Sequence, residues 1–161
     1  MEPPRSRADT RAGHDAVGTT VAVHRVLLAT DLSTASGRAA VEAIRIAARS
    51  DAHLLVFSVI DPGRLRLPGG RFLRRVDQER SRVEDGVQHL VRRARTEGVD
   101  ATFLVWEGDP AEAIIAAAEA EDADCIVLGS RGRNSLGRIL LGSTSSRVAE
   151  AATCPVQVVP G

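Results

Sequence analysis

The sequence predicts an α/β fold in which helices cover both faces of an open, parallel, five-stranded sheet. Short apolar runs alternate along the chain with longer segments that have the 3.6-residue periodicity of helices. The apolar runs are continuous, as in strands that are buried on both faces. The segments between them are too long for hairpin turns, which favours parallel strands joined by helical crossovers.

The boundaries of the elements follow from capping and turn residues. Ser33 can cap the first helix, and Asp109 followed by Pro110 is typical of a helix start. Gly98 indicates the end of the long second helix, whereas Gly86 within that helix counts against an unbroken one. The expected strands cover residues 21–30, 52–60, 101–106, 125–128 and 155–159, and the expected helices cover about 33–50, 71–97, 110–120 and a segment after 142.

The chain has 161 residues, a usual size for one domain. Residues 1–20 are rich in Pro, Arg, Asp, Gly and Thr and show no periodicity, so we expect a disordered tail before a single domain over residues 21–161. No stretch has the apolar length of a membrane span or of a signal peptide, which favours a cytoplasmic location without membrane contact.

The charged residues exclude several functional classes. The 21 basic and 21 acidic residues balance, which gives no electrostatic case for binding nucleic acid. All basic residues are Arg, and the absence of Lys excludes a P-loop nucleoside triphosphatase and Schiff-base chemistry. Cys125 and Cys154 form no CxxC pair, so we expect two small buried side chains and no metal site.

A glycine-rich loop follows the fourth expected strand. Gly129, Gly132 and Gly142 are separated by two and nine residues, and a run of hydroxyl side chains begins at Ser143. Those hydroxyls can cap a helix that begins there. A strand, a glycine-rich loop and a helix N-terminus together suit a phosphate group, although the same loop could be a simple turn.

This spacing is the G-x2-G-x9-G-[ST] signature of nucleotide-binding universal stress proteins, and the chain resembles that family from Arg25 to Pro160. The runs V-L-L-A-T-D-L-S, G-D-P-A-E-A-I and C-P-V-Q-V-V-P resemble its first strand and turn, its third helix and its last strand. The resemblance implies the strand order 3-2-1-4-5 of the adenine nucleotide alpha hydrolase-like fold. It also implies a site for ATP, with which the family often binds Mg²⁺.

By that resemblance, Asp31 holds the ribose, the backbone near Val59 recognises adenine, and the amides of Ser143 and Thr144 hold phosphates. Two plainer interpretations remain open, in which Asp31 caps a helix and Val59 is a core residue. Arg131, Arg133 and Arg138 are further candidates for phosphate contacts, or are simply solvated. The implied nucleotide-binding residues are Ala29, Thr30, Asp31, Val59, Gly129, Ser130, Arg131, Gly132, Gly142, Ser143, Thr144 and Ser145.

The sequence favours a binding protein over an enzyme. It contains no Gly-x-Ser-x-Gly nucleophile elbow, and we expect no histidine near Asp31 and Gly129, so no catalytic residue is assigned. The expected function is a nucleotide-dependent regulator of the stress response, with a slow ATPase and a nucleotide-free interaction module as alternatives. The apolar fifth strand would lie at a sheet edge, which, like the resemblance, indicates a homodimer paired through that strand.

Overall fold

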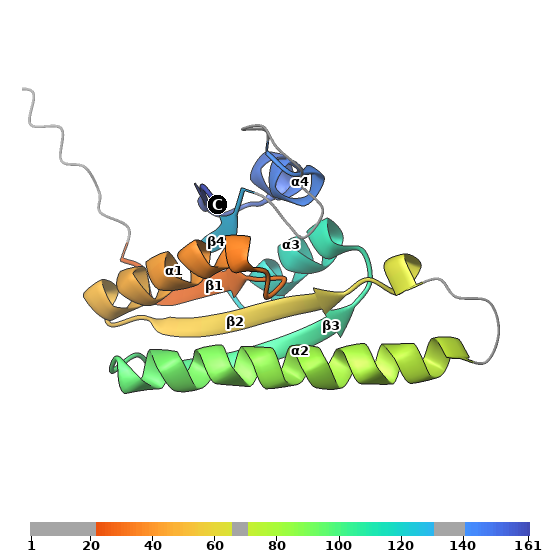
Figure 1. Cartoon of the computed structure of the whole chain (residues 1–161). Helices are drawn as coiled ribbons and strands as arrows, with labels where there is room; N and C mark the ends of the chain where they lie inside the picture. Colours follow the sequence, from red (N-terminus) through yellow and green to blue (C-terminus); the bar gives the residue numbers. More distant parts are fainter. Residues whose placement is uncertain (1–21, 66–70, 131–140) are drawn as a thin grey trace, which may run out of the picture.

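The structure is a computed structural model that describes residues 22–65, 71–130 and 141–161. Its sheet has five parallel strands in the order β3-β2-β1-β4-β5, which confirms the expected fold and order (Figure 1). The tail predicted over residues 1–20 lies outside the described residues. The strands are β1 (Arg25–Ala29), β2 (His53–Ile60), β3 (Ala101–Glu107), β4 (Cys125–Gly129) and β5 (Val156–Val159).

Two hydrophobic cores form because side chains alternate between the two faces of each strand. Val26 and Leu28 of β1 point into the first core cluster, beneath α1 (Gly37–Ser50) and α2 (Arg71–Thr96). Leu27 and Ala29 point into the second core cluster, beneath α3 (Pro110–Ala120) and α4 (Ser143–Ala151). Figure 1 shows α2 lying along β2 and β3. Each strand therefore contributes to both clusters.

The helix ends agree largely with the signals in the sequence. Ser33 accepts a hydrogen bond from the Ser36 N–H and caps a short 3-10 helix, η1 (Thr34–Ser36), which leads into α1. Asp109 caps α3 by accepting a 3.0 Å hydrogen bond from the Glu112 N–H. Gly98 follows α2 with a φ of +82°, which suits a glycine stop. Gly86 does not interrupt α2, so the doubt about that helix was wrong.

The first strand is shorter than predicted. We expected residues 21–30, but β1 covers Arg25–Ala29. At its start, the backbone N–H groups of His24 and Arg25 donate to Asp124 Oδ2 at 2.7 and 2.8 Å, while the His24 carbonyl still accepts a 2.8 Å hydrogen bond from the His53 N–H. The His24 and Arg25 donors hold the pKa of Asp124 below its usual value. After it, the Thr30 N–H still bonds to the Phe57 carbonyl, at 2.9 Å, before the chain turns away.

Candidate functional site

A cavity of about 300 Å³ opens at the carboxyl ends of β1, β2 and β4. This is the point where the strand order reverses, because the chain moves from β1 outward to β3 and then returns to β4 on the other side. Ligands of open α/β sheets bind at such a switch point. Of the residues that the sequence predicts, the cavity is lined by Ala29, Thr30, Asp31, Val59, Gly129, Gly142, Ser143, Thr144 and Ser145.

The N-terminus of α4 faces this cavity without a side-chain cap. Its N-cap is Gly142, which corrects the expectation that a hydroxyl would cap the helix. The Ser145 hydroxyl instead donates backward, to the carbonyls of Gly142 at 2.9 Å and Ser130 at 3.2 Å. Ser130 also accepts a 2.7 Å hydrogen bond from the Gly142 N–H. Uncapped amides at a helix N-terminus attract anions.

Ser130 therefore joins the end of β4 to the start of α4, although it does not itself line the cavity. Arg131, Gly132, Arg133 and Arg138 fall in the part of the loop that lies outside the described residues. The structure thus describes the two ends of the glycine signature, and the role of the signature stays a prediction.

Asp31 lies in a tight turn at the end of β1. Its Oδ1 accepts a 3.0 Å hydrogen bond from the Ser33 N–H. The Thr30 hydroxyl accepts one at 3.1 Å from the Leu32 N–H and lies 3.0 Å from the Ser36 hydroxyl. Asp31 is not the helix cap, because Ser33 has that role. Its carboxylate instead shapes the turn at the edge of the cavity.

The backbone of Val59 is directed toward the open side of the sheet. β1 ends where Ala29 pairs with Phe57, whereas β2 continues to Ile60. The Phe57 carbonyl points toward β1 and the Ile60 carbonyl toward β3, as their bonds to Thr30 and Gly108 show. Because these directions alternate along a strand, the N–H and C=O of Val59 point to the β1 side, beyond the end of β1. The family resemblance implied a binding role for the backbone at this position.

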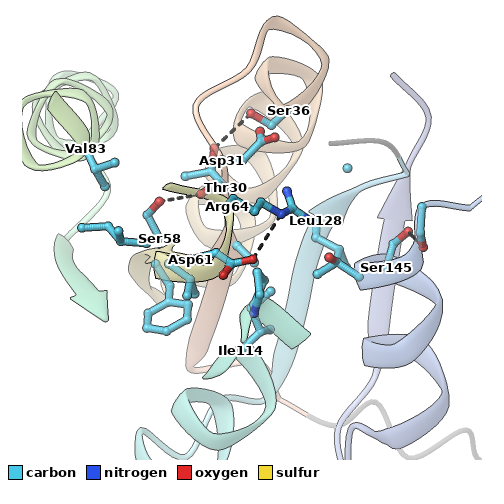
Figure 2. A pocket seen from close by; sticks show the side chains of 18 of the residues that line it. Thr30, Asp31, Ser36, Ser58, Asp61, Arg64, Val83, Ile114, Leu128 and Ser145 are labelled. Atoms are coloured by element: carbon cyan, nitrogen blue, oxygen red, sulfur yellow. Dashed lines mark hydrogen bonds and ion pairs between the residues drawn. The ribbon is translucent and has the colours of Figure 1, made fainter. Parts of the chain in front are cut away.

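Further lining residues come from η2 (Pro62–Leu65) and from α2. Arg64 Nε bonds to Asp61 Oδ2 at 3.1 Å, and both residues line the cavity (Figure 2). Asp61 Oδ1 also accepts a 2.9 Å hydrogen bond from the Gly63 N–H. Glu79 lines the α2 side and pairs with Arg82. The position of Asp61 directly after a strand is the signal that could have found it.

Apolar side chains complete the walls. Val83 of α2, Ile114 of α3 and Leu128 of β4 line the cavity from three elements (Figure 2). All three are also members of the core clusters. In the sequence they are indistinguishable from other core residues, and only the packing of helices on the sheet brings them to the cavity.

Other polar groups that the sequence analysis considered lie elsewhere. His53 bonds to Asp100 at 2.9 Å and to Thr102 at 2.8 Å, at the opposite end of β2. Both cysteines are free, and burial raises the pKa of the Cys125 thiol to about 11. Among the described residues, no three His, Cys, Asp or Glu side chains lie together in a way that could hold a metal ion. No helix in the described ranges is long and apolar enough to cross a membrane.

The chain is similar in sequence and in fold to known proteins. Residues 22–160 match the profile of the universal stress protein family. Universal stress protein MJ0531 of Methanocaldococcus jannaschii is 35% identical over 137 residues, which cover 84% of this chain and 81% of that protein. The solved structure of universal stress protein UspA from Lactobacillus plantarum has a TM-score of 0.78 at 29% identity, covering 85% of this chain and 97% of that one.

A second solved structure contains a ligand. It is a universal stress protein in complex with cAMP, with a TM-score of 0.66 at 27% identity, and the match covers 86% of this chain and 98% of that one. The family profile spans almost the whole described part of the chain. The chain therefore belongs to the universal stress protein family.

Proposed function

We propose that this chain is an ATP-binding universal stress protein, which acts as a nucleotide-dependent regulator of the stress response in the cytoplasm. The observation that carries the proposal is that the uncapped N-terminus of α4 and the freed backbone of Val59 face one cavity of about 300 Å³. A helix N-terminus suits phosphate, and free strand groups suit a base edge. The similar chain solved with cAMP supports an adenine nucleotide as the ligand.

Each part of the nucleotide has a proposed partner. The amides of Ser143 and Thr144 hold phosphates, together with the glycine loop that contains Gly132. Asp31 accepts hydrogen bonds from ribose hydroxyls at the end of β1. The backbone of Val59 pairs with the base edge, while apolar side chains such as Val83 and Ile114 exclude water from the walls.

A magnesium ion would enter this site with ATP. Mg²⁺ is usually held by one or two carboxylates and by the phosphates of its nucleotide. The carboxylates of Asp31, Asp61 and Glu79 line the cavity, so carboxylate ligands are available there besides the phosphates. The ion would neutralise phosphate charge.

We further propose that the protein binds ATP without being specialised to hydrolyse it. His53 and His24 lie at the opposite ends of their strands from the cavity, so neither can act as a base there. Three carboxylates, those of Asp31, Asp61 and Glu79, line the cavity and keep a slow ATPase as the second candidate. Sensitive measurement of phosphate release from ATP distinguishes the two functions.

Assembly through β5 completes the proposal. β5 is an edge strand that pairs only with β4 in the described sheet. The carbonyls of Pro155 and Val159 point toward β4, so the backbone groups of Val156 and Val158 point outward along the free edge. A symmetric dimer would pair these groups with a second copy.

Calorimetry with ATP and Mg²⁺ on the purified chain tests the nucleotide site. We expect binding by the wild type, strongly weakened binding by Asp31→Ala, and unchanged binding by Asp77→Ala. Asp77 is the matched control, since it is an exposed carboxylate on α2 outside the cavity. Mass spectrometry of nucleotide retained during purification identifies the ligand. A wild type that binds neither ATP, ADP nor AMP at millimolar concentration would contradict the proposal.

A further inference from the structure

Leu32, the residue after Asp31, has a backbone conformation that residues other than glycine rarely adopt. Leu32 has a φ of 61°, in the left-handed region that is usually left to glycine, asparagine or aspartate. Such a conformation persists where the surrounding structure holds it, and it is concentrated at functional sites. The contacts of Leu32 therefore indicate what fixes the turn that contains Asp31.

Local hydrogen bonds hold the turn from one side. The Leu32 N–H donates to Thr30 Oγ1 at 3.1 Å, and the next amide, of Ser33, donates to Asp31 Oδ1 at 3.0 Å. The Thr30 carbonyl accepts a 2.8 Å hydrogen bond from the buried Ser58 hydroxyl of β2. The turn is thereby attached to β2, but none of these bonds involves the Leu32 side chain.

The Leu32 side chain is held by α2, at Gly86. It packs against the first core cluster, and a β-carbon added to Gly86 would lie 2.4 Å from Leu32 Cδ1 and 3.3 Å from Leu32 Cγ. These distances are shorter than van der Waals contact, so no larger residue fits at Gly86 while Leu32 keeps its place. Glycine is unfavourable inside a helix, and this contact is a tertiary reason for it in α2.

We propose that Gly86 and Leu32 are positioning residues for the nucleotide site. The missing side chain at Gly86 leaves the space that Leu32 occupies, and Leu32 in this position keeps the turn that directs Asp31 to the cavity. Val83, one helical turn before Gly86, lines the same cavity. Helix α2 therefore both lines the cavity and holds the Leu32 side chain. The inference rests on the proposed nucleotide binding.

The first test compares two glycine-to-alanine variants by calorimetry with ATP and by circular dichroism. We expect Gly86→Ala to keep the helical spectrum but to bind ATP about tenfold more weakly, which is the scale of one lost hydrogen bond to a charged group. Gly37→Ala is the matched control, since Gly37 also lies in a helix and a β-carbon there would meet nothing within 4 Å. We expect its affinity to equal that of the wild type.

A double variant distinguishes positioning from a general effect on α2. Leu32→Gly in the Gly86→Ala background removes the clash, and glycine adopts a φ of 61° readily. Because the Leu32 side chain that holds the turn is also missing, we expect the double variant to bind ATP about as weakly as Gly86→Ala alone, since both changes break the same contact. A double variant with wild-type affinity would show that the turn does not need Leu32, and losses that add up would show a separate effect on α2; either result would overturn the proposal.

A third variant leaves α2 untouched and remains informative if Gly86→Ala does not fold. Leu32→Val places a β-branched residue where φ is positive, which is strongly disfavoured. We expect weaker ATP binding, and unchanged affinity would contradict the role of Leu32. If the wild type itself binds no nucleotide, the proposed function fails; if it binds and Gly86→Ala binds equally well, only this inference fails.

Discussion

Arg147 of α4 donates to Asp109, the N-cap of α3, with its Nη1 atom 2.9 Å from Asp109 Oδ2. This ion pair fixes the two helices of one face against each other, close to the cavity. The bond from Arg147 and then the Glu112 N–H hold the pKa of Asp109 below its ordinary value. The pKa of Asp109 therefore depends on the ion pair that joins α3 and α4.

The first prediction concerns this pKa. We expect Arg147→Ala to raise the pKa of Asp109 toward that of a free aspartate, measured by NMR titration of its carboxyl carbon. Because the folded-state pKa is the lower one, the stabilisation is complete above about pH 4, the unfolded value, and is lost as the pH falls through the folded-state pKa. The pair is largely exposed, so we expect the loss of stability to be small. An unchanged pKa in the variant would show that the ion pair does not form in solution.

The second prediction concerns Ser145, whose hydroxyl bonds to two carbonyls beside the cavity. Ser145 is 2% exposed, so water cannot replace it easily. We expect Ser145→Ala to cost about 1 kcal/mol in the free energy of unfolding, measured by urea denaturation. We also expect weaker ATP binding, because the start of α4 loses one of its two hydrogen bonds to the Ser130 carbonyl. Ser81→Ala, which removes an exposed hydroxyl on α2, is the control. Equal stability of the two variants would argue against the buried link.

The third prediction concerns Gly132, which lies outside the described residues. The glycine signature predicts that the backbone there approaches a phosphate closely, where a side chain would take the ligand's space. We expect Gly132→Val to abolish ATP binding in calorimetry while circular dichroism shows an unchanged fold. Gly137→Val changes a glycine in the nine-residue spacer, where the signature specifies no residue, and should retain binding. Retained affinity in Gly132→Val would remove this residue from the site.

The fourth prediction concerns assembly through β5. We expect light scattering at micromolar concentration to give the mass of a dimer. Val158→Arg is an ambiguous probe, because the Val158 side chain packs against the second core cluster. Val158→Pro removes an outward N–H and leaves the carbonyls that bond β4 in place, so it should shift the mass toward the monomer. A monomeric wild type would reject the dimer regardless of the variant.

Local signals in the sequence predicted most of the fold, whereas contacts between distant segments were not predictable. Strand alternation, Asp109 before Pro110 and the stop at Gly98 are local features, and the structure confirms them. The contact between Leu32 and Gly86 joins segments 54 residues apart, so the sequence showed only an unexplained glycine. The strand order came from the family resemblance, since apolar runs alone do not define which strands are neighbours.

The candidate site shows the same division. The glycine spacing and the strand-end Asp31 were visible in the sequence, and the structure brings Gly129, Gly142 and Asp31 to one cavity. The replacement of a hydroxyl cap by Gly142 was not visible, because several hydroxyls in succession give no indication of which one turns back toward Ser130. The place of Arg64 and Asp61 at the cavity was not predicted either.

The separation of the core into two clusters affects how local unfolding and ligand binding are coupled. Val83 belongs to the cluster beneath α1 and α2, and Ile114 belongs to the cluster beneath α3 and α4, yet both line the same cavity. A ligand held there would contact both core clusters, so local unfolding of the helices over either cluster would release it. Amide hydrogen exchange should therefore slow together in α2 and α3 when ATP is added, although these helices lie on opposite faces of the sheet.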